Sequence, residues 1–342
     1  MTQTAPLVDE AALSAYAGPQ LPGDGPLSVE RLGDAGHSNL TFVVRRGSHE
    51  WILRRPPLGP LQPTAHDVIR EYRVQDLLAR IGGVRVPQVA LACEDVDVIG
   101  APFYLVERVP GSVVRNMLPD WLADDLDARH EVGLDMVRAL VELHSAPIEP
   151  FVEARLGRPD GYLSRQLDRV GALRAATTVR ELPDYEVVAG WLAAHRPESG
   201  APTVVHGDYK LDNVVVAPGP RVVALLDWEM ATVGDPLADV GYWLSFWPEA
   251  GEHDEFFENL GAVTMLPGFA TRAELTAAYA AATGRDLSAI DWYVVFGIWK
   301  IAVILETSYA RHLAGMSDDP FFARLEEGVP ALLRRARLIT GG

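Results

Sequence analysis

The stretch HGDYKLDNVVV, residues 206–216, places one histidine, one lysine, one asparagine and two aspartates in a short segment that then turns apolar. The apolar run TVV precedes it and VVV ends it, so the pattern predicts a polar loop between two short buried strands. Strands on both sides make a loop a rigid platform for side-chain chemistry. We therefore expect the functional site to be built around this loop.

A hairpin is predicted directly after the loop. The strand pattern VVALLD returns after the turn residues APGP, which brings Asp227 back beside Asn213. Asp208, Asn213 and Asp227 are therefore expected to meet at one point. The side-chain oxygens of Asn213 and Asp227 suit Mg²⁺ that carries substrate phosphates, which leaves the Asp208 carboxylate free to accept a proton.

Composition limits the class of protein. A chain of 342 residues with 48% hydrophobic content can bury a large core, and its length favours two domains or one two-lobed unit. The net charge of −17 argues against nucleic-acid binding, because phosphate neutralisation needs a basic face. Cys93 is the only cysteine, which excludes an internal disulfide. No signal sequence or long apolar window is visible, so we expect a cytoplasmic protein with no membrane partner.

The sequence pattern changes once along the chain. Residues 1–27 are interpreted as a tail or cap, and residues 28–109 as short strands with one helix among them. Residues 110–342 have mainly helical spacing, with one island of strand pattern around the loop described above. This organisation predicts an α+β protein with a small β-rich N-terminal lobe, a larger helical C-terminal lobe and a cleft between them.

A cation and a carboxylate in the first lobe are predicted to pair. Alternation along the strand WILR puts Ile52 and Arg54 on one face. Glu71 shares a helix face with Val74 and Leu78, so its carboxylate points to the apolar side of the helix. A carboxylate in that position needs a cationic partner, and Arg54 is the natural candidate.

Two sets of residues carry a family resemblance. HGDYKLDN followed by LLDWE resembles the catalytic loop and the metal-binding segment of the aminoglycoside phosphotransferase family, relatives of the protein kinases. RRPPLGPLQPTAHDVIREYRV and LLDWEMATVGDPLADVGYW resemble the branch whose members occur fused to acyl-CoA dehydrogenases or encoded separately. The likeness runs from about Leu32 onward. It implies a bilobal protein-kinase-like fold, with ATP and Mg²⁺ as cofactors.

The resemblance also implies a role for each residue of the site. Gly33 and Gly36 would let backbone N–H groups approach the phosphates. His206 and Asp239 would brace the loop. Asp208 would act as the catalytic base, and Lys210 would be the cation on the transferred phosphoryl group. Asn213 and Asp227 would bind the metal, and the pair Arg54 and Glu71 would bind the phosphates, with arginine in place of the family's usual lysine. The backbone of Glu107 and Val109 would bind adenine.

The sequence also bears on two other functions, a protein kinase and a metal-dependent hydrolase. Gly207 stands where regulated protein kinases usually carry an arginine, and no Ala-Pro-Glu motif follows, which disfavours a protein substrate. A hydrolase with His206 and Asp208 as metal ligands lacks companion histidines at ligand spacing. The sequence therefore predicts a kinase that phosphorylates a hydroxyl group of a small molecule. An aminoglycoside or choline-like amine kinase, and a nucleotide-binding module without turnover, remain alternatives.

The acceptor is predicted from weaker signals. The C-terminal half carries an aromatic helix set that suits an acyl group: Tyr242, Trp243, Phe246, Trp247, Trp292, Phe296 and Trp299. Lys300 is interpreted either as a snorkelling surface lysine or as a cation facing the cleft, which would repel a polyamine. Together with the family branch, these features favour a hydroxyacyl-CoA over a kanamycin-type compound as acceptor. A homodimer is left open.

Overall fold

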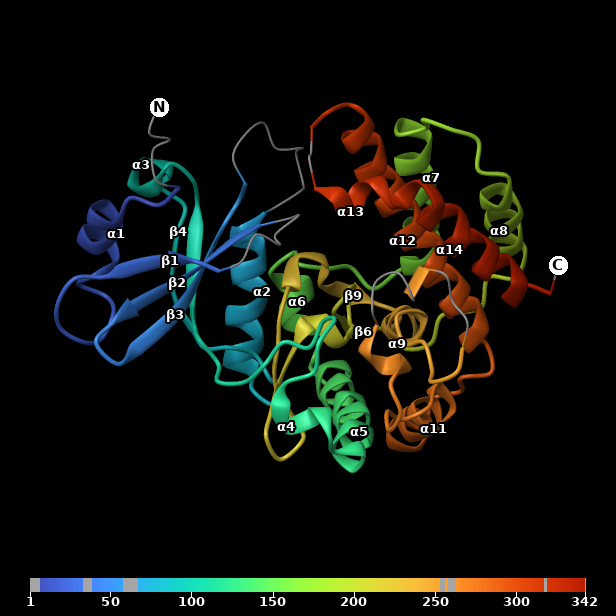
Figure 1. Ribbon diagram of the computed structural model, residues 1–342, viewed down its shortest axis with the longest axis horizontal. Helices are drawn as coiled ribbons and strands as arrows, with labels where there is room; N and C mark the ends of the chain where they lie inside the picture. The colour runs from blue at the N-terminus through green and yellow to red at the C-terminus, as the bar shows by residue number, and fades with distance from the viewer. Residues whose placement is uncertain are drawn as a thin grey trace.

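The computed structural model describes residues 7–32, 39–57, 67–252, 256–257, 262–316 and 319–341. It divides into a sheet-rich N-terminal part, here called the N-lobe, and a helical remainder, the C-lobe (Figure 1). The predicted α+β class is confirmed. Among the described residues, every helix is too short or too polar to cross a lipid bilayer.

The N-lobe is built on one antiparallel sheet with the strand order β1-β2-β3-β5-β4. The predicted hairpin is present, because β2 pairs with β3 and Gly47 adopts the positive φ of 59° that the turn requires. The elements are β1 (Ser28–Arg31), β2 (Leu40–Arg46), β3 (His49–Arg55), β4 (Val89–Cys93), β5 (Phe103–Glu107), α1 (Glu10–Ala17), α2 (Val68–Ile81) and α3 (Val96–Ile99).

The two faces of this sheet bury different residues, as the alternation of side chains requires. Leu53 packs on one face with Leu13 and Ala17 of α1, so the described part of the first segment covers the sheet. Ile52 lies on the other face, where it packs with Tyr104 and Val68 of α2. Figure 1 shows α2 between the sheet and the C-lobe. That second face is therefore the one that meets the catalytic part of the molecule.

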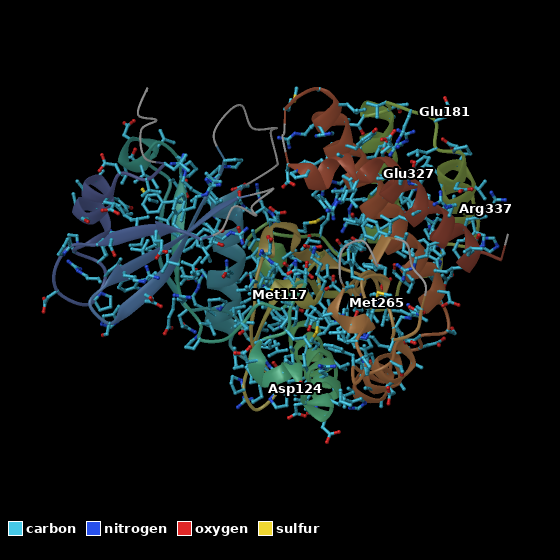
Figure 2. The ribbon with its side chains drawn as sticks, in the orientation of Figure 1. Met117, Asp124, Glu181, Met265, Glu327 and Arg337 are labelled. Atoms are coloured by element: carbon cyan, nitrogen blue, oxygen red, sulfur yellow. The ribbon has the colours of Figure 1, made fainter. Side chains whose placement is uncertain are left out.

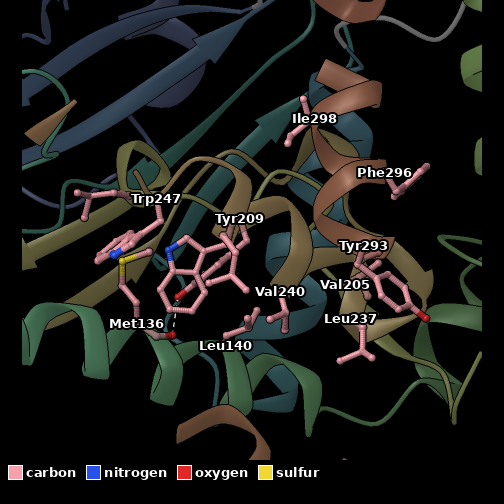
Figure 3. Close-up of a cluster of buried hydrophobic side chains, with 14 of the residues drawn as sticks. Met136, Leu140, Val205, Tyr209, Leu237, Val240, Trp247, Tyr293, Phe296 and Ile298 are labelled. Carbon is pink, nitrogen blue, oxygen red and sulfur yellow. Dashed lines mark hydrogen bonds between the residues drawn. The ribbon is translucent and has the colours of Figure 1, made fainter. Parts of the chain in front are cut away.

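The C-lobe consists of helices around a continuous apolar core. Figure 3 shows part of that core, where the Tyr209 hydroxyl donates a hydrogen bond of 2.7 Å to the carbonyl of Met136. The helices are α4 (Asp120–Ala123), α5 (Leu126–His144), α6 (Glu149–Glu153), α7 (Tyr162–Ala176), α8 (Pro183–Ala194), α9 (Pro236–Ser245), α11 (Arg272–Thr283), α12 (Ile290–Leu313), α13 (Pro320–Ala323) and α14 (Leu325–Ile339), with the short 3-10 turn η3 (Val263–Met265). Charged side chains such as Glu181 and Arg337 lie at the edge of this lobe far from the N-lobe (Figure 2).

Two small antiparallel sheets interrupt the helices and carry the polar loop. The elements are β6 (Thr203–Val205), η1 (Leu211–Asn213), β7 (Val214–Ala217), β8 (Arg221–Leu225), η2 (Trp228–Met230) and β9 (Thr232–Gly234). β6 pairs with β9, and β7 pairs with β8 as the predicted hairpin. The polar loop therefore leaves one sheet at Val205 and enters the other at Val214, which fixes it at both ends.

Candidate active site

Backbone hydrogen bonds to a buried carboxylate fix the start of the polar loop. Asp239 of α9 is 1% exposed and accepts hydrogen bonds from the N–H of His206, at 2.6 Å, and the N–H of Gly207, at 2.8 Å. His144 lies 3.2 Å from the same carboxylate. Burial alone would raise the pKa of Asp239, but the hydrogen bonds from His144 and from the Gly207 N–H hold it below its usual range. Asp239 is therefore an ionised brace under the loop.

The His206 ring is held in one orientation by two backbone groups. Its Nε2 lies 2.8 Å from the carbonyl of Leu226, and its Nδ1 accepts from the N–H of Asp208 at 3.3 Å. Nε2 can contact a carbonyl only as a donor, so the ring is the neutral Nε2–H tautomer. With both nitrogens occupied, His206 orients the residues on either side of it.

Asp208 follows this brace and remains ionised. Burial would raise the pKa of its carboxyl group, but Lys210, a hydrogen bond from Tyr242 and the charge of Lys300 hold the pKa below its usual value. The Lys210 Nζ lies 3.6 Å from Asp208 Oδ2 and 5.2 Å from the centre of the Phe246 ring. An ionised carboxylate of this kind can accept a proton.

The structure brings Asn213 and Asp227 beside Asp208, as the hairpin predicts. The Asn213 side-chain amide donates to the Asp208 carbonyl at 2.8 Å and to Asp208 Oδ2 at 2.6 Å. These bonds use the nitrogen, so the Asn213 oxygen stays available for a cation. Leu226 N–H donates to the Asn213 carbonyl at 2.8 Å and so joins the end of β8 to the loop. Asp227 has a φ of 65°, an uncommon backbone conformation outside glycine that often marks functional sites.

Arg54 joins the N-lobe to this site. Its Nη1 lies 3.4 Å from Glu71 Oε1, and its Nη2 lies 3.4 Å from Asp227 Oδ1. Glu71 is fully buried, and burial raises the pKa of its carboxyl group, while Arg54 acts in the opposite direction. For Arg54 burial would lower the pKa, but Glu71 together with Tyr104, Asp227 and Glu229 outweighs burial and keeps the guanidinium protonated. The sequence-predicted pair is therefore present, and it extends to Asp227.

A cavity of about 490 Å³ lies beside these charges, and it is lined by both lobes. Arg54, Glu71, Asn213 and Asp227 line one part of it, and Ile52, Val106, Val215 and Leu226 give it an apolar wall. Glu107 and Val109 also line it, and the Val109 N–H donates no hydrogen bond within the described part of the chain. Its size and its mixed polar and apolar lining suit a small-molecule ligand. Gly33 and Gly36 lie outside the described residues.

The donor set fits a magnesium ion held partly by a ligand. Within the described ranges, no group of three or more histidine, cysteine, aspartate or glutamate side chains is arranged to hold a metal ion. Asn213 and Asp227 offer one amide and one carboxylate, and Mg²⁺ in proteins commonly has only one or two carboxylate ligands beside water and substrate phosphates. These two residues therefore fit Mg²⁺ carried by a nucleotide better than an ion bound by protein alone.

Two residues near the site were missed or left open by the sequence prediction. Burial, followed by the charges of Asp227 and Glu71, raises the pKa of Glu229 to about 8, which places this carboxyl group in the same cluster. Its signal was its position two residues after Asp227. Lys300 is 6% exposed and donates 2.8 Å to the Gly207 carbonyl, so the snorkelling interpretation is wrong. The rarity of lysine in the sequence could have drawn attention to it, because Lys210 and Lys300 are the only lysines of the chain.

The aromatic helix set does not line an acceptor pocket. Trp243 and Trp247 are 1% exposed, and Trp292, Phe296 and Trp299 are 3% exposed or less. Figure 3 shows Trp247 and Phe296 within the core. Apolar residues at helical spacing pack the interior more often than they line a site, and these five aromatic residues are packed in the core. Tyr242 and Phe246 contact the site, through Asp208 and the Lys210 ammonium respectively.

Comparison with known sequences places the chain among phosphotransferases. A family model described as "Phosphotransferase enzyme family" matches residues 29–293 of this chain. Acyl-CoA dehydrogenase family member 11 of Rattus norvegicus is 33% identical over 333 residues, which cover 92% of this chain and 41% of the rat protein. Member 10 of Mus musculus is 33% identical over 306 residues, which cover 86% of this chain and 27% of the mouse protein. The chain thus spans less than half the length of these curated relatives.

Solved structures agree with the sequence match, and this agreement fixes the fold. A Ralstonia eutropha JMP134 protein assigned as an aminoglycoside phosphotransferase is 29% identical, with a TM-score of 0.76 over 97% of this chain and 99% of that one. The aminoglycoside phosphotransferase APH(4)-Ia, solved with AMP-PNP and hygromycin B, has a TM-score of 0.62 at 14% identity over 97% of each chain. The predicted kinase-like fold is confirmed, and the match over residues 29–293 shows that this chain belongs to the phosphotransferase enzyme family.

Proposed function

We propose that the chain transfers the γ-phosphoryl group of ATP to a hydroxyl group of a small molecule. The observation that carries this proposal is the convergence of three residues: Asn213 donates a hydrogen bond to Asp208, and Asn213 and Asp227 line the cavity that Arg54 and Glu71 also line. A base, a metal-binding pair and a phosphate-binding cation are the parts that phosphoryl transfer requires. The match to a phosphotransferase family supports the same assignment.

In this proposal Asp208 acts on the acceptor. The acceptor oxygen forms a bond to the γ-phosphorus while the bond from that phosphorus to the bridging oxygen of ADP breaks. Asp208 is ionised and takes the hydroxyl proton. Lys210, 3.6 Å from Asp208, neutralises charge on the transferred group. His206 and Asp239 keep the loop in place and do not touch the reacting atoms.

The nucleotide would be held by groups from both lobes. Arg54 contacts the α- and β-phosphates, with its orientation fixed by Glu71, and the unpaired N–H of Val109 together with the Glu107 carbonyl binds the adenine edge. Asn213 and Asp227 hold Mg²⁺ through their oxygens, with Glu229 beside them. When bound, Mg²⁺ neutralises phosphate charge and favours an in-line arrangement of the attacking and leaving oxygens.

We propose a hydroxyacyl-CoA as acceptor, because the sequence relatives are named acyl-CoA dehydrogenase family members. Aminoglycoside and choline-like amine kinases are the alternatives. A nucleotide-binding module without turnover is disfavoured by the complete set of Asp208, Lys210, Asn213 and Asp227.

The test is a panel of acceptors incubated one at a time with MgATP. Mass spectrometry of the acceptor, rather than ATP loss alone, detects the transferred phosphoryl group. We expect a phosphorylated hydroxyacyl-CoA, no phosphorylated kanamycin and no product with the Asp208→Asn variant. Phosphorylation of kanamycin with no activity on any hydroxyacyl thioester would contradict the acceptor. Nucleotide binding with no product from the whole panel would favour the module without turnover.

A further inference from the structure

A second cleft, of about 1170 Å³, lies beside the catalytic loop, is lined by the start of α2 and by the C-lobe, and carries an excess of positive charge. Gly207, which directly precedes Asp208, and Lys300 both line it. Its ionisable lining residues comprise six cationic side chains, namely Arg70, Arg155, Arg158, Arg165, Arg169 and Lys300, against the three acidic ones Asp67, Asp168 and Glu229. This balance opposes that of the whole chain, whose net charge is −17. We call this site the arginine cleft.

Four of these arginines have no carboxylate partner. In the part of the chain that the structure describes, no aspartate or glutamate lies within ion-pair distance of Arg155, Arg158, Arg165 or Arg169. Their charges act on neighbouring arginines, and Asp160 opposes this effect at Arg165. Burial, then the charge of Arg158, lowers the pKa of Arg165, and Arg169 contributes to the lowered pKa of Arg70. An excess of like charges held together without ion-pair partners favours the binding of an anion.

The loop that carries two of these arginines is fixed against the catalytic segment. The Arg70 guanidinium donates to the carbonyl of Leu156, at 3.0 Å, and to the carbonyls of Glu229 and Ala231. Gly157 packs so closely on β9 that an added Cβ would lie 2.3 Å from the Val233 nitrogen. The arginine loop is therefore built against the residues that follow Asp227. It is not a mobile surface segment that happens to be basic.

Two backbone features add to the positive potential. The fifteen-residue helix α7 has Gly161 at its N-cap and no side-chain capping bond, so its first N–H groups and its dipole favour negative charge. Tyr162, Arg165 and Gln166 of its first turns line the cleft. Arg155 adopts a φ of 57°, an uncommon conformation for a residue with a side chain. The N-terminal end of α7, the loop that carries Arg155 and Arg158, and the arginine side chains all line the arginine cleft.

We propose that the arginine cleft binds the phosphate groups of a phosphorylated acceptor through Arg155, Arg158, Arg165 and Arg169. This inference rests on the proposed function, since it places the acceptor of that reaction in the cleft lined by Gly207, next to Asp208, and the nucleotide in the cavity lined by Asn213 and Asp227. The cleft would exclude acceptors that carry several ammonium groups, because its cations repel them. The acceptor is thus recognised by its own phosphates, independently of the phosphoryl group that it receives.

The test is direct binding with the nucleotide cavity already filled. Saturating ADP and Mg²⁺ are present throughout, so a phosphate-bearing probe cannot enter that cavity. Coenzyme A, pantetheine and inorganic pyrophosphate are titrated by calorimetry at low salt. We expect coenzyme A and pyrophosphate to bind and compete, pantetheine to bind at least about 10-fold more weakly than coenzyme A, and binding to weaken as salt rises.

Two variants, one on α7 and one in the loop before it, test the inference separately. The pair Arg165→Ala with Arg169→Ala, and separately Arg158→Ala, should each weaken coenzyme A binding by about 10-fold or more, because each removes charge-assisted contacts to phosphate. The matched control is Arg73→Ala, an exposed N-lobe arginine paired with Glu94, which should leave binding unchanged. ADP binding reports that each variant is folded.

The outcomes separate this inference from the proposed function. Binding of pyrophosphate but not coenzyme A would support a phosphate site and reject the CoA acceptor. Undiminished coenzyme A binding by Asp208→Asn, with no turnover, would support both proposals. Full turnover by Asp208→Asn would overturn the base assignment and leave the cleft intact. No binding of either phosphate probe to the wild type, or equal affinity in wild type and arginine variants, would overturn the inference.

Discussion

The nucleotide cavity and the arginine cleft flank the same loop, yet they treat positive charge in opposite ways. In the nucleotide cavity Arg54 lies 3.4 Å from both Glu71 and Asp227. In the arginine cleft, four arginines lie without ion-pair partners among the described residues. A paired cation is oriented before its ligand arrives, whereas unpaired cations repel one another until an anion neutralises them. Under the two proposals, the first arrangement would position a phosphate chain, and the second would select a ligand by charge.

Asp208 lies on the loop between Gly207, which lines the arginine cleft, and Asn213, which lines the nucleotide cavity, and as the proposed base its loss has the largest expected effect. Asp208→Asn should lower kcat by about 100-fold or more, because the amide cannot accept the hydroxyl proton. Binding of MgATP and of the acceptor should change little, which separate calorimetric titrations would measure. Near wild-type turnover would show that another group is the base.

Asp227 tests the metal side of the nucleotide cavity. Asp227→Asn removes the charge while asparagine still tolerates the φ of 65°, so the backbone is preserved. We expect the Mg²⁺-dependent tightening of nucleotide binding to fall by at least about 10-fold. Calorimetry with and without Mg²⁺ provides the measurement, and coenzyme A binding to the arginine cleft is the internal control. If the effect of Mg²⁺ on nucleotide binding is unchanged, Asp227 does not bind the metal.

Substitution of Arg54 tests whether the use of ATP depends on the shape of the paired cation as well as on its charge. A lysine at this position has one Nζ and cannot contact Glu71 and Asp227 as two separate guanidinium nitrogens do. We expect Arg54→Lys to lower kcat/KM for ATP by about 10-fold, with KM for the acceptor unchanged. Steady-state kinetics with each substrate varied separates the two constants. A variant as active as the wild type would show that charge alone suffices.

The sequence predicted the nucleotide cavity far better than the arginine cleft, for a physical reason. Alternation along β3 and helical spacing along α2 are local patterns, so Arg54 and Glu71 could be assigned to facing surfaces before the fold was known. Arg165 lies on α7 and Lys300 on α12, and only tertiary packing brings them to one cleft. Hydrophobic periodicity also could not distinguish an aromatic core from an aromatic pocket, which is why the acceptor site was sought among residues that the core buries.

Lys300 tests the electrostatic difference between the two sites most directly, and its effect is expected on stability at alkaline pH. Burial lowers the pKa of Lys300 to about 8 from 10.5. The charged groups that face it act in both directions: Asp208 and Asp239 favour the ammonium, whereas Arg169 and Lys210 oppose it. Its hydrogen bond goes to the neutral carbonyl of Gly207. Unlike Arg54, it is therefore expected to lose its proton at moderately alkaline pH.

The sign of the resulting stability change follows from proton binding. Between about pH 8 and 10.5 the unfolded chain keeps the Lys300 proton that the folded chain has lost, so raising the pH favours the folded state. Relative to Lys300→Met, the wild type should gain up to about 1.4 kcal/mol of unfolding free energy per pH unit in this window. Urea unfolding of both proteins from pH 7 upward measures the difference. Because the chain has only two lysines, NMR of isotope-labelled lysine can assign the titration to Lys300 itself. Parallel stability curves with a Lys300 signal that titrates above pH 10 would show that this lysine is as firmly charged as Arg54.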